Sequence, residues 1–153
     1  MDYRREYKVD SRIARIFNTY GPRMALDDGR VVSNFIEQAL SHKPITIYGD
    51  GTQIRSFCYV DDLIDGLVKL FFKEDMNTPV NLGNPVPITM NELADKILAL
   101  TGSNSKVIYL PLPEDDPLTR KPDIEKAKSL LGWEPVIELE QGLTKTILDF
   151  QSR

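Results

Sequence analysis

Apolar residues recur with the period of an α-helix in three stretches of the chain. In residues 31–41 they occupy the i, i+3, i+4, i+7 and i+8 positions that form one helix face: Val32, Phe35, Ile36, Ala39 and Leu40. The second stretch, residues 61–73, begins at Asp61, a residue type that caps helix N-termini. The third runs from Leu139 to Phe150. We therefore predict amphipathic helices over these three ranges.

Shorter apolar runs predict strands. Five runs have strand character: residues 11–17, 45–48, 54–59, 79–82 and 106–110. Gly49-Asp50-Gly51-Thr52 separates the second run from the third, a spacing that predicts a β-hairpin. The alternative interpretation of these glycines is a phosphate-binding loop, which needs a helix N-terminus directly after it. Because the following run is strand-like, we interpret the segment as a hairpin turn.

Capping signals predict two further helices. Thr89 and Glu92 have the spacing of a capping box, and Gly102 is the glycine that commonly follows a helix. Asp123 predicts the cap of a short helix that ends at Gly132. Small strands alternating with helices, without a dividing linker, predict one mixed α/β domain. Residues 1–8 have the pattern of the last turns of a helix, so we expect the chain to begin within a fold.

Composition narrows the possible functions. The 153 residues carry a formal net charge of −4, with 41% hydrophobic and 27% charged residues, which is the balance of a soluble globular domain. A negative net charge disfavours nucleic acid or an anionic membrane as the main partner. Cys58 is the single cysteine, which excludes an intrachain disulfide and favours a reducing compartment. No apolar run approaches the roughly 20 residues of a membrane span. We expect a cytoplasmic protein.

Polar residues at the ends of predicted strands are candidates for a ligand site. Residues 15–24, RIFNTYGPRM, run from a strand into a glycine–proline turn and place Asn18 at the strand end, where open α/β sheets bind ligands. Tyr48 and Arg55 flank the glycine turn, and an aromatic ring beside a guanidinium suits a base and a diphosphate. Arg120 directly precedes a predicted helix. Taken one at a time, these residues are equally consistent with turns and solvated surface.

Other residues with reactive side chains have ordinary structural interpretations. The acidic cluster Glu114, Asp115 and Asp116 is a candidate carboxylate pair or metal site, but no histidine lies near it in the sequence. We interpret it as a solvated loop and predict no metal. Cys58 lies in a predicted strand without a nearby histidine, so we predict an inert thiol in the core.

The order of the motifs resembles one known family. The segments RIFNTYGPRM, DGRVVSNFI, YGDGTQIRSFCYVDDLIDGL, VNLGNP, DDPLTRKPDI and LGWEP follow one another as in the C-terminal half of the extended short-chain dehydrogenase/reductase family. Within that family, RIFNTYGPRM, GRVVSNFI and RKPDI resemble the UDP-glucuronate decarboxylases, or UDP-xylose synthases, rather than the epimerases or dehydratases. The resemblance covers essentially the whole chain.

The resemblance implies a reaction and a cofactor. In this family a Rossmann half binds NAD and the C-terminal lobe closes on the nucleotide sugar. UDP-glucuronate is oxidised at C4, the resulting β-keto acid loses CO₂, and reduction gives UDP-xylose, so NAD is recycled. Residues 1–153 would then form the nucleotide-sugar lobe, with residues 1–18 a helix end and a strand left from the Rossmann half. The complete enzymes of the family are homodimers.

The resemblance also implies roles for individual residues. Thr46 and Tyr48 match the positions that meet the uracil and ribose. Arg55 matches the arginine that clamps the diphosphate, and Asn18 matches an asparagine that holds the diphosphate or the sugar. These four residues form the implied substrate-binding set.

Three further residues are implied by the same motifs. Arg120 matches an arginine near the reacting centre, where a guanidinium would stabilise an anionic substrate and its enolate or hold a water. Direct proton donation by Arg120 would need a strongly lowered pKa, which is difficult for arginine. Arg30 is a further candidate for the diphosphate, and Thr19 for the nicotinamide end of NAD.

Two motifs of the family do not occur in this sequence. It has no G-x-x-G-x-x-G turn for NAD and no Tyr-x-x-x-Lys pair, since Tyr3 is followed by Lys8, five positions later. We therefore expect a fragment that is inactive alone, does not bind NAD stably and exposes the edge of the strand at residues 12–17. The alternatives are a non-catalytic UDP-sugar-binding regulatory module and a fragment of a related dehydratase or epimerase. A membrane anchor upstream would instead place the protein in the Golgi lumen.

Overall fold

Short strands alternate with helices along the computed structural model, which describes residues 6–113 and 117–153. The helices are α2 (Val31–Leu40), α3 (Val60–Phe72), α4 (Met90–Thr101), α5 (Glu125–Leu131) and α6 (Leu139–Gln151). The strands are β1 (Ala14–Ile16), β2 (Thr19–Tyr20), β3 (Ile45–Tyr48), β4 (Ile54–Arg55), β5 (Cys58–Tyr59), β6 (Val80–Leu82), β7 (Ile88–Thr89), β8 (Val107–Leu110) and β9 (Thr119–Arg120). The α/β prediction is confirmed. Of the predicted N-terminal helix tail, Glu6 and Tyr7 are helical, and residues 1–5 lie outside the described part.

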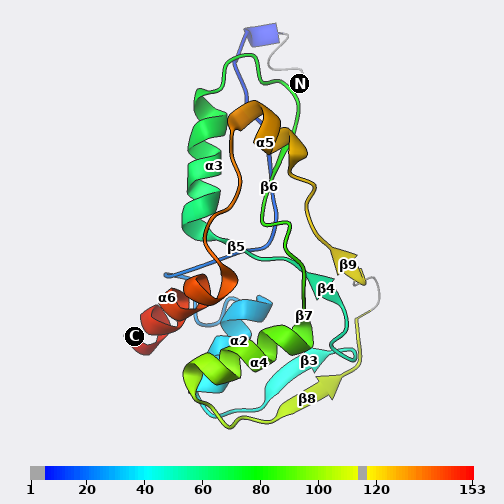
Figure 1. Ribbon diagram of the computed structural model, residues 1–153, viewed down its shortest axis with the longest axis vertical. Helices are drawn as coiled ribbons and strands as arrows, with labels where there is room; N and C mark the ends of the chain where they lie inside the picture. Colours follow the sequence, from blue (N-terminus) through cyan, green and yellow to red (C-terminus); the bar gives the residue numbers. More distant parts are fainter. Residues whose placement is uncertain (1–5, 114–116) are drawn as a thin grey trace.

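One end of the molecule is built around the parallel pair β1 and β6, in which Ala14 lies opposite Val80. A parallel pair requires a crossover connection, and α3 lies in that connection. Figure 1 shows α3 and α5 beside β6 at this end. Trp133 is buried here against Gly66 of α3, and its Nε1 donates to the Asp62 carbonyl oxygen at 2.9 Å. The buried cluster of this end consists of Cys58, Leu63, Leu70, Met76, Val80, Leu82, Ile124, Ala127 and Trp133.

The other end is built around the parallel pair β3 and β8, with Ile45 opposite Val107. Helices α2 and α4 pack against each other and against β3, and α6 contacts both helices (Figure 1). Of the apolar stripe predicted for residues 31–41, Leu40 is partly buried and the other four residues are buried, as expected for an amphipathic helix. The core of this end includes Phe35, Ile36, Ile45, Ile47, Leu93, Ile97, Leu143 and Ile147. Strands β2 and β5 pair in parallel, with Thr19 opposite Cys58.

The hairpin predicted around residues 49–52 is wrong. Strand β3 pairs with β8, whereas β4 pairs antiparallel with β7 and parallel with β9. Gly49 and Gly51 do adopt left-handed φ angles of 76° and 78°. The loop is bound to the start of α4, because the Asn91 backbone N–H donates to the Gly51 oxygen and its Nδ2 donates to the Asp50 oxygen, both at 3.1 Å. These bonds direct β4 away from β3.

The capping box of α4 is confirmed. The Thr89 hydroxyl accepts the Glu92 backbone N–H at 3.2 Å, and the Glu92 carboxylate accepts the Thr89 backbone N–H at 2.8 Å. Gly102 follows the helix with a left-handed φ of 64°. Both ends of α4 are therefore fixed by local sequence.

The predicted caps of α3 and α5 need correction. The N-cap of α3 is Tyr59, and Asp61 lies in the first turn. The neighbouring Asp62 is buried, and its carboxylate accepts the Ile137 backbone N–H at 2.9 Å, so it ties α3 to the segment before α6. The N-cap of α5 is Ile124, although the Asp123 carboxylate still accepts the first helical N–H.

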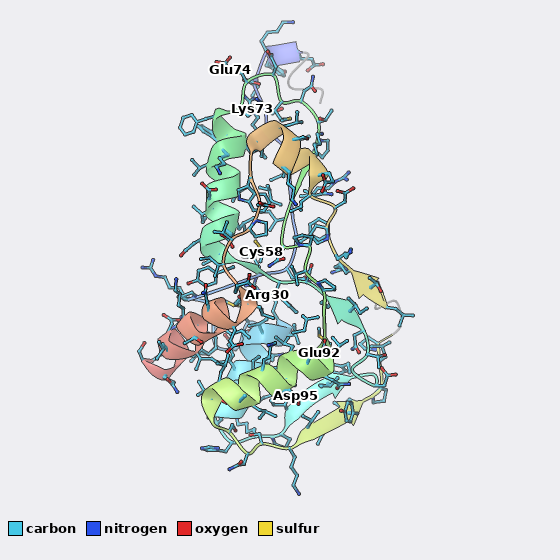
Figure 2. All side chains as sticks on the ribbon, in the orientation of Figure 1. Arg30, Cys58, Lys73, Glu74, Glu92 and Asp95 are labelled. Carbon is cyan, nitrogen blue, oxygen red and sulfur yellow. The ribbon has the colours of Figure 1, made fainter. Side chains whose placement is uncertain are left out.

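The Glu92 carboxylate makes the stability of the chain depend on pH. The backbone and hydroxyl hydrogen bonds from Thr89 lower its pKa below the ordinary 4.5. Stabilisation by this group is therefore complete above pH 4.5 and is lost as pH falls through the lowered value. We expect Glu92→Ala to unfold at lower urea concentration than the unmodified chain at pH 7, and the difference to shrink below pH 4.5. Asp95→Ala on the next turn of α4 (Figure 2) is the control, and a pH-independent difference for Glu92→Ala would contradict the assignment.

One face of α3 is apolar and exposed. Ile64, Val68, Phe71 and Phe72 are between 49% and 74% exposed, and with Arg12 and Ala14 they line a hollow of about 380 Å³. Patches of this kind are normally covered by another protein segment. In the described ranges, no helix is both long and apolar enough to cross a membrane.

Candidate functional site

A cavity of about 230 Å³ lies at the N-terminal end of α2. Its apolar wall includes Met24, Phe35, Ile47, Phe57 and Met90. Its polar lining comes from separate parts of the sequence: Asn18, Thr19, Arg30, Thr46, Gln53 and Arg55. A largely apolar cavity with a few convergent polar groups is the usual form of a small-molecule site.

One extended segment contributes three alternate residues to the cavity. Gln53, Arg55 and Phe57 all line it, as expected when every second side chain of an extended segment faces the same side. Arg55 is only 8% exposed, and its Nη1 donates to the Ile54 carbonyl oxygen at 2.9 Å. A buried guanidinium in an apolar wall interacts with an anion more strongly than one in bulk water.

Asn18 lies between β1 and β2, Thr19 is the first residue of β2, and both line the cavity. Asn18 Nδ2 donates to the Ser56 carbonyl oxygen at 3.2 Å, and its backbone oxygen accepts the Cys58 N–H at 2.8 Å. The Ser56 hydroxyl is buried and has no hydrogen-bond partner in the described structure. Thr19 donates its hydroxyl to the Phe17 carbonyl oxygen at 2.8 Å. The backbone around Asn18 is therefore fixed by the segment that follows Arg55, including the first residue of β5.

Strand β3 supplies Thr46 and Tyr48. The Thr46 backbone N–H donates to Gln38 Oε1 of α2 at 3.0 Å, which holds the strand against the helix. Tyr48 ends the strand and is 49% exposed, so its ring is open to solvent while the residue still lines the cavity. A partly exposed ring at a cavity is available to stack on a planar ligand.

Arg30 directly precedes α2 and is labelled in Figure 2. Its Nε donates to both carboxylate oxygens of Asp28 at 2.8 Å, and this hydrogen bonding raises the pKa of Arg30. The Asp28 carboxylate offsets the positive charge. Arg30 is therefore a weaker candidate for an anionic ligand than Arg55.

Arg120 lies beside the cavity and is not part of its lining. In the parallel pair of β4 and β9, Arg120 lies opposite Arg55. Paired residues on adjacent strands project from the same face of a sheet, so the two arginines share a face. Arg120 is exposed, in contrast to Arg55.

The remaining candidates lie apart from this cavity. Cys58 is buried, and burial together with the negative charge of Asp62 raises its pKa to about 12, so the predicted core thiol is confirmed. Glu114, Asp115 and Asp116 lie outside the described residues. Among residues 6–113 and 117–153, no group of three or more His, Cys, Asp or Glu side chains is placed to hold a metal ion.

Sequence reasoning missed Gln53 and the apolar lining. The period-two alternation of Gln53, Arg55 and Phe57 was a usable signal, because a strand that places Arg55 in a site places its alternate neighbours there too. Met24 and Met90 carried no comparable signal, since methionines in a core and in a cavity wall look alike in sequence.

Comparison with protein families and curated proteins gives a consistent result. Residues 1–83 match the NAD dependent epimerase/dehydratase family. UDP-glucuronic acid decarboxylase 4 of Arabidopsis thaliana is 56% identical over 153 residues, which are 100% of this chain and 34% of that protein. UDP-glucuronic acid decarboxylase 1 of Danio rerio is 54% identical over 97% of this chain and 35% of its own length. The chain thus spans well under half the length of these relatives.

Solved structures share the fold. UDP-glucose 4-epimerase from Thermotoga maritima, determined with UDP-glucose, is 34% identical, with a TM-score of 0.93 over 99% of this chain and 49% of that one. UDP-glucuronic acid 4-epimerase from Bacillus cereus, in complex with UDP-glucuronic acid and NAD, is 29% identical, with a TM-score of 0.90 over 99% and 48%. Both are similar to this chain over almost all of its length.

Proposed function

The chain belongs to the NAD dependent epimerase/dehydratase family, and from this premise we propose that it supplies the UDP-sugar site of a UDP-glucuronate decarboxylase. Curated relatives at 51–56% identity carry that name, which supports the decarboxylase over the epimerases found among the solved structures at 34% identity or less. The observation that carries the proposal is the cavity itself. The same cavity is lined by motif residues from three separate segments: Asn18, Tyr48 and Arg55.

We propose the following roles for the cavity residues. Tyr48 and Thr46 bind the uracil and ribose, because an aromatic ring and a hydroxyl suit a base and a sugar. Arg55 binds the diphosphate, since its planar fork matches phosphate oxygens. Asn18 has one amide hydrogen and an oxygen left for the diphosphate or the hexose. Arg30 is a secondary diphosphate contact that would exchange part of its pairing with Asp28.

The reaction we propose removes the carboxylate of UDP-glucuronate as CO₂ and leaves UDP-xylose. Loss of CO₂ from a 4-keto sugar places negative charge on C5 and the C4 oxygen, and a proton must then reach C5. Arg120 can stabilise that charge or hold the water that donates the proton. A guanidinium is a poor proton donor, so in this proposal the proton comes from the water.

NAD is the cofactor of the complete enzyme in this proposal, where it would supply the reversible oxidation at C4. The described residues offer one candidate contact, Thr19, whose hydroxyl hydrogen is already donated to Phe17. A single hydroxyl does not form a dinucleotide site, which needs backbone N–H groups around the diphosphate. The described residues therefore do not fit NAD as a complete site, and we assign them no step through it. A homodimer of the complete enzyme belongs to the same proposal.

The proposal is tested in two stages. Calorimetry on the chain should show saturable binding of UDP and UDP-glucuronate and no binding of free glucuronate. A chimera that joins the N-terminal part of the Arabidopsis relative to this chain should convert UDP-glucuronate to UDP-xylose and CO₂. A UDP-sugar product that keeps the carboxylate and is inverted at C4 would favour the epimerase alternative. The regulatory module would be favoured if the chain co-elutes with a full-length relative and changes its rate while the chimera is inactive.

Arg120→Ala in that chimera is expected to lower kcat more than it lowers UDP affinity, because the guanidinium acts at the reacting end of the substrate. Steady-state kinetics and UDP calorimetry measure the two effects separately. Lys121→Ala, a neighbouring cation, is the control and should change neither. Equal losses in turnover and affinity would instead make Arg120 an anchoring residue.

A further inference from the structure

We propose that Gln53 is a positioning residue for the nucleotide: it holds Tyr48 at the cavity by binding the main chain of that residue. This inference rests on the proposed function, because it takes Tyr48 as the residue that meets the base. Gln53 has none of the nucleotide-binding roles assigned above to Thr46, Tyr48 and Arg55.

The geometry of Gln53 supports this role. Its Nε2 donates to the Tyr48 carbonyl oxygen across the intervening loop. Gln53 is only 7% exposed and its side chain lines the cavity, so the bond is made from inside the site. In such a setting, loss of one partner leaves a polar group unpaired, which is unfavourable. The glutamine and the carbonyl therefore fix each other.

The bond also closes an otherwise open strand edge. Strand β3 pairs with β8 through its odd-numbered residues, so Thr46 and Tyr48 direct their main-chain groups to the opposite edge. On that edge, Gln38 accepts the Thr46 N–H and Gln53 binds the Tyr48 oxygen. Two glutamine side chains thus take the place of a neighbouring strand at the two residues that we propose bind the uracil and ribose.

The loop between Tyr48 and Gln53 is itself held in place. The Asp50 carboxylate accepts the Thr52 backbone N–H at 2.9 Å, and Asn91 binds the oxygens of Asp50 and Gly51. Gln53 therefore reaches Tyr48 from a fixed position. A ring that is placed before the ligand arrives removes part of the ordering cost of binding.

A double-mutant cycle tests the proposal in the full chain. Gln53→Met keeps the size of the side chain and removes the hydrogen bond, and Tyr48→Leu removes the ring. We expect Gln53→Met to weaken UDP binding about five- to tenfold when Tyr48 is present and less than about twofold in the Leu background. Affinity for pyrophosphate, which has no base, should change less than about twofold.

Controls make the outcomes decisive. Gln141→Met, exposed on α6, should leave UDP affinity unchanged, and thermal unfolding checks that each variant folds. If Gln53→Met does not fold, Gln53→Asn, whose shorter side chain cannot reach the Tyr48 oxygen, replaces it in the cycle. Equal weakening in both backgrounds, or none in either, overturns the positioning role alone. Failure of the unmodified chain to bind UDP overturns the proposed function as well.

Discussion

Replacing Arg55 by alanine is expected to weaken UDP binding by about 1.5–3 kcal/mol, or roughly 10- to 150-fold. The reason is the position of Arg55, a residue only 8% exposed in a largely apolar cavity, where solvent screens its charge poorly. Arg55→Lys should fall between the unmodified chain and Arg55→Ala, because lysine keeps the charge and loses the planar fork. Isothermal titration calorimetry with UDP measures all three affinities.

The matched control for Arg55 is Arg15→Ala. Arg15 is an exposed residue of β1 and does not line the cavity, so its loss removes the same charge from a different place. Thermal unfolding of each variant separates lost affinity from lost structure. If Arg55→Ala folds and binds UDP as tightly as Arg15→Ala does, Arg55 does not contact the diphosphate.

The largest loss of stability is expected from Gly142→Ala. In an open helix this change would stabilise by about 1 kcal/mol, since alanine has the higher helix propensity. At this position a Cβ atom would lie 2.1 Å from the Tyr20 hydroxyl oxygen and 2.8 Å from Tyr59 Cδ2. Tyr20 is 1% exposed and has no space to retreat. Overpacking of this kind costs up to about 3 kcal/mol, so the net effect should be a loss of about 2 kcal/mol.

Thermal unfolding measures this loss as a fall in Tm of roughly 5 °C for a chain of this length. Gln141→Ala, one residue away and exposed, is the control for helix propensity and should leave Tm almost unchanged. Tyr20→Phe removes the closest atom and should recover part of the loss when combined with Gly142→Ala. A rise in Tm for Gly142→Ala would show that α6 does not pack on Tyr20 as described.

Local features of the fold were predictable because their causes lie within a few residues. The capping box at Thr89 and Glu92 and the glycine after α4 work through neighbouring backbone groups, so the sequence alone identifies both helix ends. The apolar stripe of α2 likewise reflects a single buried face. Asp62 shows the limit of such reasoning, because its partner is the backbone of Ile137 far along the chain.

Strand pairing was not predictable in the same way. Residues 45–48 and 54–59 have the pattern of a hairpin, but β3 pairs with β8, β4 with β7 and β9, and β5 with β2. Glycines that adopt left-handed φ angles suit a loop bound to Asn91 as well as a hairpin turn, so their presence does not distinguish the two. Strand β9 has only two residues and is formed by pairing with β4. Two residues are too few to show the alternation of apolar and polar positions that predicts a strand.

The proximity of the candidate residues was easier to predict than the sheet topology. Asn18, Thr46, Tyr48 and Arg55 were chosen by motif, and the structure brings all four to one cavity. Arg120 lies beside it on the adjoining strand. These segments lie close together because of packing between distant parts of the chain. The motifs alone do not reveal that packing, and it could be expected only because their order resembles a known family.

The most direct test of the account is amide chemical-shift mapping by NMR while UDP is added to the chain. The account predicts saturable shifts concentrated at Asn18, Thr46, Tyr48, Gln53 and Arg55. A separate hollow is lined by Asn84, Lys96 and Glu138 among others. Shifts confined to that hollow, or no shifts at saturating UDP, would contradict the account.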